Sequence, residues 1–507
     1  MKKISYLLLA AAFLTFSSCE DELDQSPISS GSVPTFYRSA TDFNQALSAT
    51  YSVLRGYPDR ELTLSETRSD NIYGVSTQGI RPWESVNNFA TTLATSEYVD
   101  DAWSSNYTGI FRANVLLDQL AQNGSVLTDD ARNRMEGEAK FLRAFYYFNL
   151  VQYFGPVPLV DKPLDPAAVR TINRTPVAEV YDLIIRDLQT AGDKLSSSYT
   201  GADVGRATKW AAKGMLARVY ITRSGPTHGI DGPGRGTNDY AAANTLLDEI
   251  INSKLFTFLP VYADIFSYTN ENNKEVLFDI QYISGGTGLG ASYPSILVTG
   301  NYFNSVVANT SGFSTGDELR AASDNLINTY AQNDLRRAQA LQVGFTVPAS
   351  GSTPAVTEPR AAFKKYLDVP KRGSSRTDWS INFIVLRYTD ILMMKAECVL
   401  KGGGAGDVDG IMNQVRRRGI ANAPLVTGTT FDQLMEERRR EFVGEGLRWH
   451  DLLRSPSAVN IMNNWIAADD IRNRMRKPIN ANDLIYPVPQ SEMAASGYLY
   501  KQNPGYN

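Results

Sequence analysis

Cysteine and histidine are nearly missing from this chain of 507 residues. It contains two cysteines, Cys19 and Cys398, and two histidines, His228 and His450. A disulfide framework is therefore excluded, and the core must be stable without one. Zinc sites and Cys–His nucleophile pairs have almost no residues from which to be built. The sequence predicts neither a metal site nor a cofactor.

The chain also lacks an excess of positive charge and long apolar runs. Its 50 Lys and Arg are outnumbered by 54 Asp and Glu, so a nucleic-acid partner is not expected. After the N-terminus, no apolar run approaches the roughly 18 residues that a membrane-spanning helix needs. Aromatic residues are abundant instead, with 26 Tyr, 21 Phe and 6 Trp. This balance favours binding by stacking over catalysis.

The first 19 residues form a distinct pattern. Lys2-Lys3 precede an uncharged apolar stretch from Ile4 to Phe16, and Ser17-Ser18 stand directly before Cys19. A positively charged N-terminus, a short apolar stretch and small residues before the cleavage site are typical of a secretory signal peptide. The position of Cys19 predicts a lipobox: residues 1–18 are removed, Cys19 is acylated, and residues 19–35 form a lipidated tether to a membrane. A plain signal peptide with a chance cysteine is the alternative.

The rest of the chain has mainly the periodicity of helices. Expected helices cover about 41–54, 100–122, 128–154, 176–194, 206–222, 240–253, 387–400 and 408–418. The helix at 128–154 is apolar nearly all round from Phe141 onward and stops at Gly155-Pro156, so we expect it at the centre of the fold. Paired helices of this length resemble tetratricopeptide units, although their period is irregular.

Irregular stretches separate these pairs at 224–239, 282–316 and 342–379, and short strands are expected at 276–280 and 484–487. The predicted fold class is mainly α: tetratricopeptide-like helical hairpins packed with a loop-rich subdomain that contains short strands. The runs Arg416 to Arg418 and Arg438 to Arg440 are interpreted as solvated or ion-paired faces, with Glu437 and Arg440 at the spacing of a surface ion pair. His450 and Asp451 are adjacent on a helix, point in different directions and cannot form a catalytic relay.

Several motifs occur in a characteristic order along the chain. They are Ser69-Asp70-Asn71, Leu142 to Phe148 with Tyr153 to Pro158, Ala207 to Lys213, Glu437 to Phe442, Arg448 to Arg454, Tyr486 to Pro489 and Asn503 to Tyr506. In this order they resemble the SusD/RagB family of surface lipoproteins from Bacteroidetes nutrient-uptake systems, essentially end to end. The resemblance implies a single SusD-like body at 36–507, with an N-terminal part at about 36–225 and a C-terminal part at about 226–507.

The resemblance further implies a place on the outer membrane, at the cell surface. Glu20-Asp21-Glu22 after the cysteine resembles the export tag of such lipoproteins. The implied partner is a SusC-type TonB-dependent transporter, and the implied ligand is a glycan or, in some members, a peptide. The family is non-catalytic. A surface glycoside hydrolase stays as an alternative, because the spatial separation of two carboxylates cannot be taken from a sequence.

Candidate ligand-binding residues are aromatic rings on loops and the hydrogen-bonding groups beside them. A sugar offers an apolar face for stacking and hydroxyl groups for Asp, Asn and Arg. The candidates in the irregular N-terminal stretch are Asp70, Asn71, Arg81, Trp83, Asn87 and Asn88, and those in later loops are Tyr282, Tyr293, Tyr302 and Trp379. Because Trp83 follows Pro82 in a segment without helical period, we expect its ring to be held outward on a loop.

Overall fold

The computed structural model describes residues 36–74, 76, 80–307, 319–349, 351–352 and 354–506. The predicted signal peptide at 1–18, the predicted lipidation site Cys19 and the tether at 19–35 lie outside these residues. Within the described part of the chain, no helix is both long enough and apolar enough to cross a bilayer.

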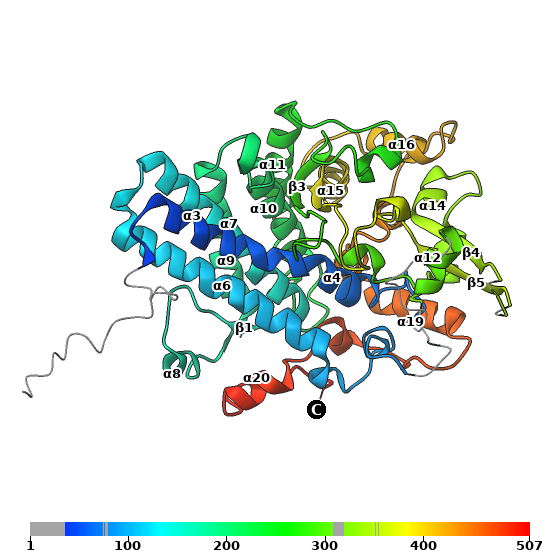
Figure 1. The fold of residues 1–507 in the computed structure, drawn as a ribbon, viewed down its shortest axis with the longest axis horizontal. Helices are drawn as coiled ribbons and strands as arrows, with labels where there is room; N and C mark the ends of the chain where they lie inside the picture. The colour runs from blue at the N-terminus through cyan, green and yellow to red at the C-terminus, as the bar shows by residue number, and fades with distance from the viewer. Residues whose placement is uncertain are drawn as a thin grey trace, which may run out of the picture.

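One half of the molecule is a set of packed helical hairpins (Figure 1). Its helices are α3 (Ala40–Ser52), α6 (Glu97–Asn123), α7 (Asp129–Phe154), α9 (Val177–Lys194), α10 (Lys209–Ser224), α11 (Tyr240–Asn252), α15 (Tyr388–Leu400) and α16 (Val408–Gly419). Helices that follow one another along this series contact each other, from α6 with α7 to α15 with α16. The predicted mainly α fold built from helical hairpins is confirmed.

Helix α7 lies at the centre of this half, as its sequence predicts. The Thr128 side chain accepts a hydrogen bond from the Ala131 amide at its start, and Gly155 ends it with a φ of 68°. Every residue from Phe141 to Phe154 is buried. Neighbouring α6 approaches closely because Gly109 has no side chain: a Cβ there would lie 2.3 Å from the ring of Tyr146.

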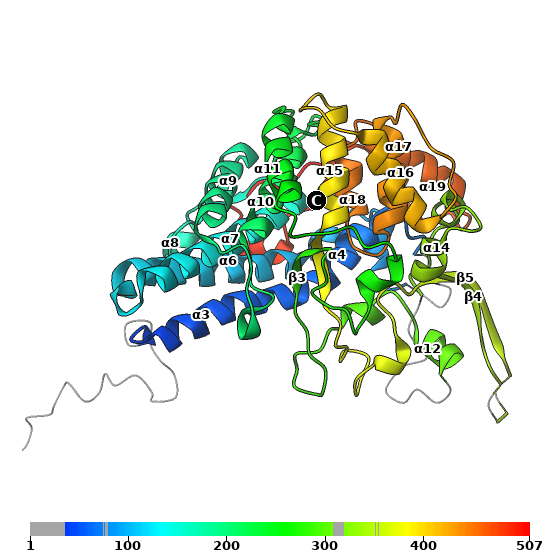
Figure 2. The same cartoon turned by 90° about the horizontal axis from the view of Figure 1, so that it is seen from above.

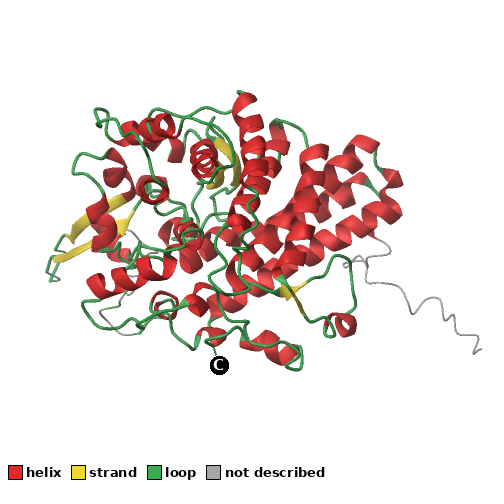
Figure 3. Ribbon diagram, turned by 180° about the vertical axis from the view of Figure 1, so that it is seen from behind, coloured by secondary structure: helices red, strands yellow, loops and turns green. Residues whose placement is uncertain are grey.

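The rest of the chain adds short helices and three two-stranded antiparallel sheets around these hairpins (Figure 3). The pairs are β1 (Val157–Pro158) with β2 (Arg174–Thr175), β3 (Val276–Ile280) with β6 (Phe383–Arg387), and β4 (Leu341–Val347) with β5 (Val356–Phe363). The further helices are α4 (Tyr57–Glu61), α5 (Glu84–Asn87), α8 (Pro166–Val169), α12 (Gly300–Val306), α13 (Asp324–Thr329), α14 (Leu335–Ala340), α17 (Phe431–Phe442), α18 (Arg448–Leu453), α19 (Ala458–Asp469) and α20 (Gln490–Ala495).

Two expectations about strands are corrected. The stretch 342–379 is not irregular throughout, because β4 and β5 form a hairpin that projects from the body (Figure 2). The strand expected at 484–487 is absent from the described residues: a short 3-10 turn ends at Leu484. There the Tyr486 amide donates to the carbonyl of Tyr153, so this segment covers the end of α7 and does not join a sheet.

The arginine runs are only partly exposed: Arg417 is exposed and Arg416 and Arg440 are half-buried, whereas Arg418, Arg438 and Arg439 are buried. The expected ion pairs are present, but those of the buried arginines lie inside the molecule. Arg438 and Arg439 are 2% and 4% exposed, because α17 packs among α15, α16 and α18. Arg438 contacts Asp390 at 2.7 Å. Glu437, which pairs with Arg440 at 2.7 Å, is buried as well, so this ion pair is not a surface pair.

A larger buried ion-pair network joins β6, α16 and α17. Arg387 contacts Glu441 and Glu445, each at 2.9 Å, and Arg418 bridges Glu275 and Glu441. Burial alone would raise the pKa of Glu441, but Arg418 and Arg387 outweigh it and hold that pKa well below its usual range. Each charge therefore has a partner, which a buried charge requires.

Candidate functional site

Asp70 and Asn71 lie in the core beneath the N-terminal irregular stretch, 1% and 0% exposed. Arg448 donates two hydrogen bonds of 2.8 Å to Asp70, one to each carboxylate oxygen. Burial would raise the pKa of Asp70, but Arg439 and Arg448 outweigh it and lower it to about 2. Asn71 donates to Glu66 and accepts from Arg439, both at 2.8 Å. The expectation that these two side chains are free to contact a ligand is wrong, because each is saturated by buried partners.

Trp83 and Asn87 are also buried, at 6% and 1% exposure. The Trp83 ring packs against Gly74, and the Arg320 guanidinium lies 5.2 Å from its centroid. Asn87 accepts from the Gly74 amide at 2.9 Å and donates to the carbonyl of Ile72 at 2.8 Å. The expectation that the Trp83 ring points outward is therefore wrong. The ring points inward at the start of the short helix α5, and the hydrogen bonds of Asn87 hold the preceding loop in place.

Arg81 and Asn88 are the candidates of this stretch that remain partly exposed. The Arg81 amide donates to Glu84 at 3.0 Å, and the Asn88 carbonyl accepts from the Arg476 amide at 3.1 Å. The side-chain carbonyl oxygen of Asn88 is buried and has no hydrogen-bond partner among the described residues. A ligand role for these two residues stays a prediction.

The four later aromatic candidates are buried as well. Tyr282, Tyr293, Tyr302 and Trp379 are 9%, 1%, 4% and 0% exposed. The Tyr282 hydroxyl donates to the carbonyl of Arg55 at 2.5 Å, and the rings of Tyr282 and Tyr293 lie 5.8 Å apart. The expectation that these rings are exposed on loops is wrong: Tyr302 belongs to α12, and the segments that carry the other three rings fold back so that the rings lie in the core.

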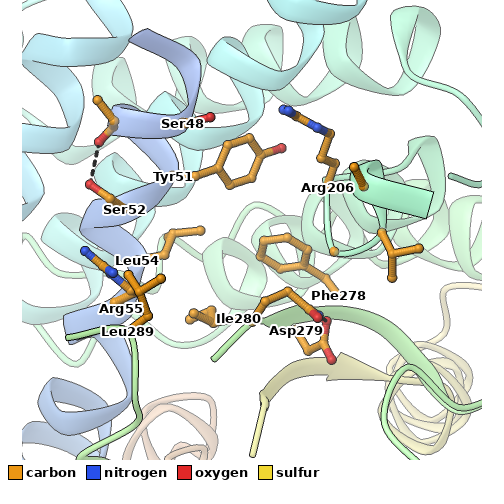
Figure 4. Close-up of a pocket in the computed structure, with 15 residues that line it drawn as sticks. Ser48, Tyr51, Ser52, Leu54, Arg55, Arg206, Phe278, Asp279, Ile280 and Leu289 are labelled. Carbon is orange, nitrogen blue, oxygen red and sulfur yellow. Dashed lines mark hydrogen bonds between the residues drawn. The ribbon is translucent and has the colours of Figure 1, made fainter. Parts of the chain in front are cut away.

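An open groove lies beside these anchored loops, with a cavity volume of about 510 Å³ (Figure 4). That volume falls within the ~300–1,000 Å³ of small-molecule sites. Its walls come from α3 and the 3-10 turn η2 (Val53–Gly56), from the turn at 201–206, from β3, and from the loop that carries Leu289. The lining residues are Ser48, Ala49, Tyr51, Ser52, Leu54, Arg55, Ala202, Val204, Gly205, Arg206, Phe278, Asp279, Ile280, Gln281 and Leu289.

The floor of the groove is apolar and its rim is polar. Leu54 and Phe278 are buried in the floor, and the half-buried ring of Tyr51 forms one side. Arg206 reaches over that ring, with its guanidinium 5.9 Å from the centroid. Gly205 closes the other side at a φ of 90°, where a Cβ would lie 2.4 Å from the side chain of Gln281. Such a groove suits a ligand with both an apolar face and hydrogen-bonding groups.

Asp279 is the one carboxylate among the described residues that line the groove. Burial raises its pKa to about 7, against hydrogen bonds from Asn382 at 3.1 Å and Gln281 at 2.5 Å. A glycoside hydrolase needs two carboxylates facing each other across the scissile bond, and the lining residues do not provide that pair.

Sequence reasoning missed the groove because its residues do not resemble a site. Tyr51 lies near the end of α3, Leu54 lies in the turn η2 that continues it, and Phe278 belongs to β3. Each has the local pattern of a core residue. Leu289 alone lies in a stretch that the sequence marked as irregular, and that was the one available signal.

Comparison with known proteins gives a consistent result across the chain. Residues 22–221 match a family described as "Starch-binding associating with outer membrane", and residues 348–506 match one described as "SusD family". A SusD-like protein P25 of Formosa agariphila is 27% identical, covering 98% of this chain and 99% of its own.

Two solved structures share the fold. Surface glycan-binding protein A from Bacteroides uniformis has a TM-score of 0.76 at 24% identity, covering 92% of this chain and 100% of its own. The protein of that name from Bacteroides thetaiotaomicron, in complex with laminarihexaose, has a TM-score of 0.73 at 22% identity, covering 92% and 99%.

Proposed function

The chain belongs to the SusD family, and from that premise we propose that it captures a glycan at the cell surface and delivers it to a SusC-type TonB-dependent transporter. The observation that carries this proposal is the match of two family regions, residues 22–221 and residues 348–506. Solved structures with this fold include surface glycan-binding proteins, which supports a glycan as the ligand.

The groove beside α3 has the chemistry for such a ligand. A sugar ring has an apolar C–H face, which packs on the Tyr51 ring and on Leu289, 42% exposed at the edge. Its hydroxyl groups bond to the rim, where Arg55, Arg206 and Gln281 provide donors and acceptors. The groove is open, so a chain of sugar units has room to extend out of it.

The anchor belongs to the same proposal. Acylation of Cys19 after removal of residues 1–18 places the body on the outer membrane, facing outward, where it meets both glycan and transporter. The change Cys19→Ala should release the protein into the soluble fraction and remove the acyl mass from its N-terminus. A variant that stays in the membrane fraction, with a wild type that lacks the acyl mass, would contradict the anchor.

Binding is proposed to occur without turnover. The lining of the groove has a single carboxylate, Asp279, and that group bonds to Asn382 and Gln281. Purified protein incubated with a bound oligosaccharide should therefore return it with unchanged mass. Product formed by pure protein, and lost on changing one carboxylate, would establish a hydrolase instead.

A panel of polysaccharides in affinity gel electrophoresis tests the ligand class. Wild type should be retarded by at least one member of a panel that includes starch and laminarin. The variant Ser48→Trp fills the groove from an exposed helix position, so it should lose that retardation. Gln45→Trp, one turn earlier and outside the lining, is the matched control. A wild type that no glycan retards, but that binds a peptide library, would replace glycan by peptide as the ligand.

A further inference from the structure

A second cavity, of about 400 Å³, opens on another side of the helical half, between α6, α8, α20 and the segment that follows α20. It shares no lining residue with the groove beside α3. Figure 1 shows α8 and α20 below α6, whereas α3 crosses above it. The two openings are therefore built from different elements and can be occupied independently.

Four aromatic side chains line this cavity. Trp103 lies at its base, 2% exposed, with the rings of Tyr107 and Tyr500 at 5.3 and 6.5 Å. The Tyr107 hydroxyl donates to the carbonyl of Pro158 at 2.7 Å, which fixes the ring. Phe111 stands at the mouth and is 55% exposed, an unusual exposure for a phenylalanine beside a cavity. The wall thus has a rigid apolar base and an accessible ring at the entrance.

The polar groups of the cavity favour a neutral, hydroxyl-bearing ligand. Glu492 is half-buried, and burial together with Asp100 raises its pKa against the lowering effect of a hydrogen bond with Trp103. Among the described residues, no Lys or Arg forms an ion pair with Glu492. Lys162 lies on the rim with the opposite charge, and Ser104 and Thr108 add hydroxyls from the helix face that carries Phe111. The opposed charges give no preference for an ion of either sign, while both groups bond well to hydroxyls.

A purely apolar occupant fits this arrangement poorly. It would remove the remaining water from Glu492 without replacing the lost hydrogen bonds, which is costly for a carboxylate. A sugar unit provides both an apolar face for Phe111 and hydroxyls for Glu492. The polar groups on the rim therefore favour a sugar over an apolar segment of a partner protein as the occupant of the cavity.

We propose that this cavity is a second carbohydrate site, which takes one or two sugar units and makes the protein bivalent for a polysaccharide. The inference rests on the proposed glycan binding and deepens it. Bivalence raises the apparent affinity for a long chain above that for a short one without any new contact, provided that one chain or one particle reaches both sites.

Calorimetric titration tests the inference, with a hexasaccharide of the polysaccharide that most retards the wild type in the panel above. We expect two molecules of hexasaccharide per protein. Phe111→Ala and Glu492→Gln should each reduce this to one and weaken polysaccharide binding at least tenfold. Leu425→Ala, which removes a side chain of similar exposure (63%) outside both cavities, should change neither value.

The outcomes distinguish a failure of the second site from a failure of the proposed glycan binding. Ser48→Trp should leave one hexasaccharide bound, and Ser48→Trp combined with Phe111→Ala should leave none. A wild type that binds one hexasaccharide, lost in Ser48→Trp and unchanged in Phe111→Ala, overturns the second site and leaves the proposed function intact. A wild type that binds no glycan overturns both.

Discussion

Replacing Asp70 by Asn tests the buried ion pairs beneath the N-terminal irregular stretch. The change removes one negative charge and leaves Arg448 and Arg439 in the core, at 5% and 4% exposure, without their shared partner. Asn keeps the size of the side chain and one acceptor oxygen, so the loss is mainly electrostatic. The sequence makes Asp70 a candidate ligand contact, whereas its buried ion pairs indicate a role in stability.

Two estimates give the magnitude. Breaking a buried ion pair by removing one partner costs about 3–5 kcal/mol. Lowering the pKa of Asp70 to about 2, from the usual value near 3.9, is equivalent to about 2.6 kcal/mol. The unfolding entropy of a chain of this size is about 1 kcal/mol per degree. We therefore expect Asp70→Asn to lower the Tm by about 3–5 °C at pH 7.

The lowered pKa of Asp70 also determines how its contribution to stability changes with pH. A carboxyl whose pKa is lower in the folded state stabilises above its unfolded pKa, and this stabilisation is lost as the pH falls through the folded value. The Tm difference between wild type and Asp70→Asn should therefore be full above about pH 5 and shrink toward pH 2.

Differential scanning calorimetry of both proteins measures these shifts, and glycan affinity should change less than twofold. Asp129→Asn is the control, because its partner Arg132 lies at 2.7 Å but both side chains are exposed. It should shift the Tm by less than about 1 °C. An unchanged Tm in Asp70→Asn with a tenfold loss of glycan affinity would refute the reasoning and restore Asp70 as a ligand contact.

Three further changes test other parts of the structure. Gly109→Ala should lower the Tm, because the new methyl would lie 2.3 Å from the Tyr146 ring, whereas Gly192→Ala should raise it slightly, since the nearest atom lies at 3.6 Å; equal effects would contradict the packing of α6 on α7. Trp83→Ala should cost about 3–5 kcal/mol of stability and leave glycan affinity within twofold, as thermal melting and electrophoresis would measure; the reverse result would return the ring to the ligand surface. The pKa of Asp279, raised to about 7, means that the folded state holds a proton that the unfolded state loses above about pH 4. Stability should therefore fall as the pH rises from about 4 to about 7 and level off above that, and Asp279→Asn should flatten this fall; identical slopes in the two proteins between these pH values would exclude the raised pKa of Asp279.

The helices could be predicted because their signals are local. The stop at Gly155 and the apolar surface of α7 are both contained in one stretch of sequence. The pairing of Asp70 with Arg448 could not be predicted in that way, since 378 positions separate the two residues. One sequence reports the composition of each segment and leaves the partner of a buried charge undetermined.

The candidate site shows the same limit. Irregular periodicity correctly marked the loops around Tyr293, but irregular backbone does not mean exposed side chains, and the hydroxyl of Tyr293 donates to the carbonyl of Asn382 at 2.9 Å inside the core. The groove unites α3, the turn at 201–206 and β3, which come together only in the folded chain. Its residues are therefore visible as a set in three dimensions and not along the sequence.

The central claim is that this protein binds a glycan in the groove beside α3. The most direct test is calorimetry with the glycan of the panel that most retards the wild type. It compares Phe111→Ala alone, in which the groove is the one proposed site left, with Phe111→Ala combined with Ser48→Trp or with Gln45→Trp, provided that all three proteins have the same Tm. We expect the dissociation constants of Phe111→Ala and of its combination with Gln45→Trp to agree within twofold, the combination with Ser48→Trp to bind at least tenfold more weakly, and the glycan to be recovered with unchanged mass. Equal affinity in all three proteins would contradict the claim.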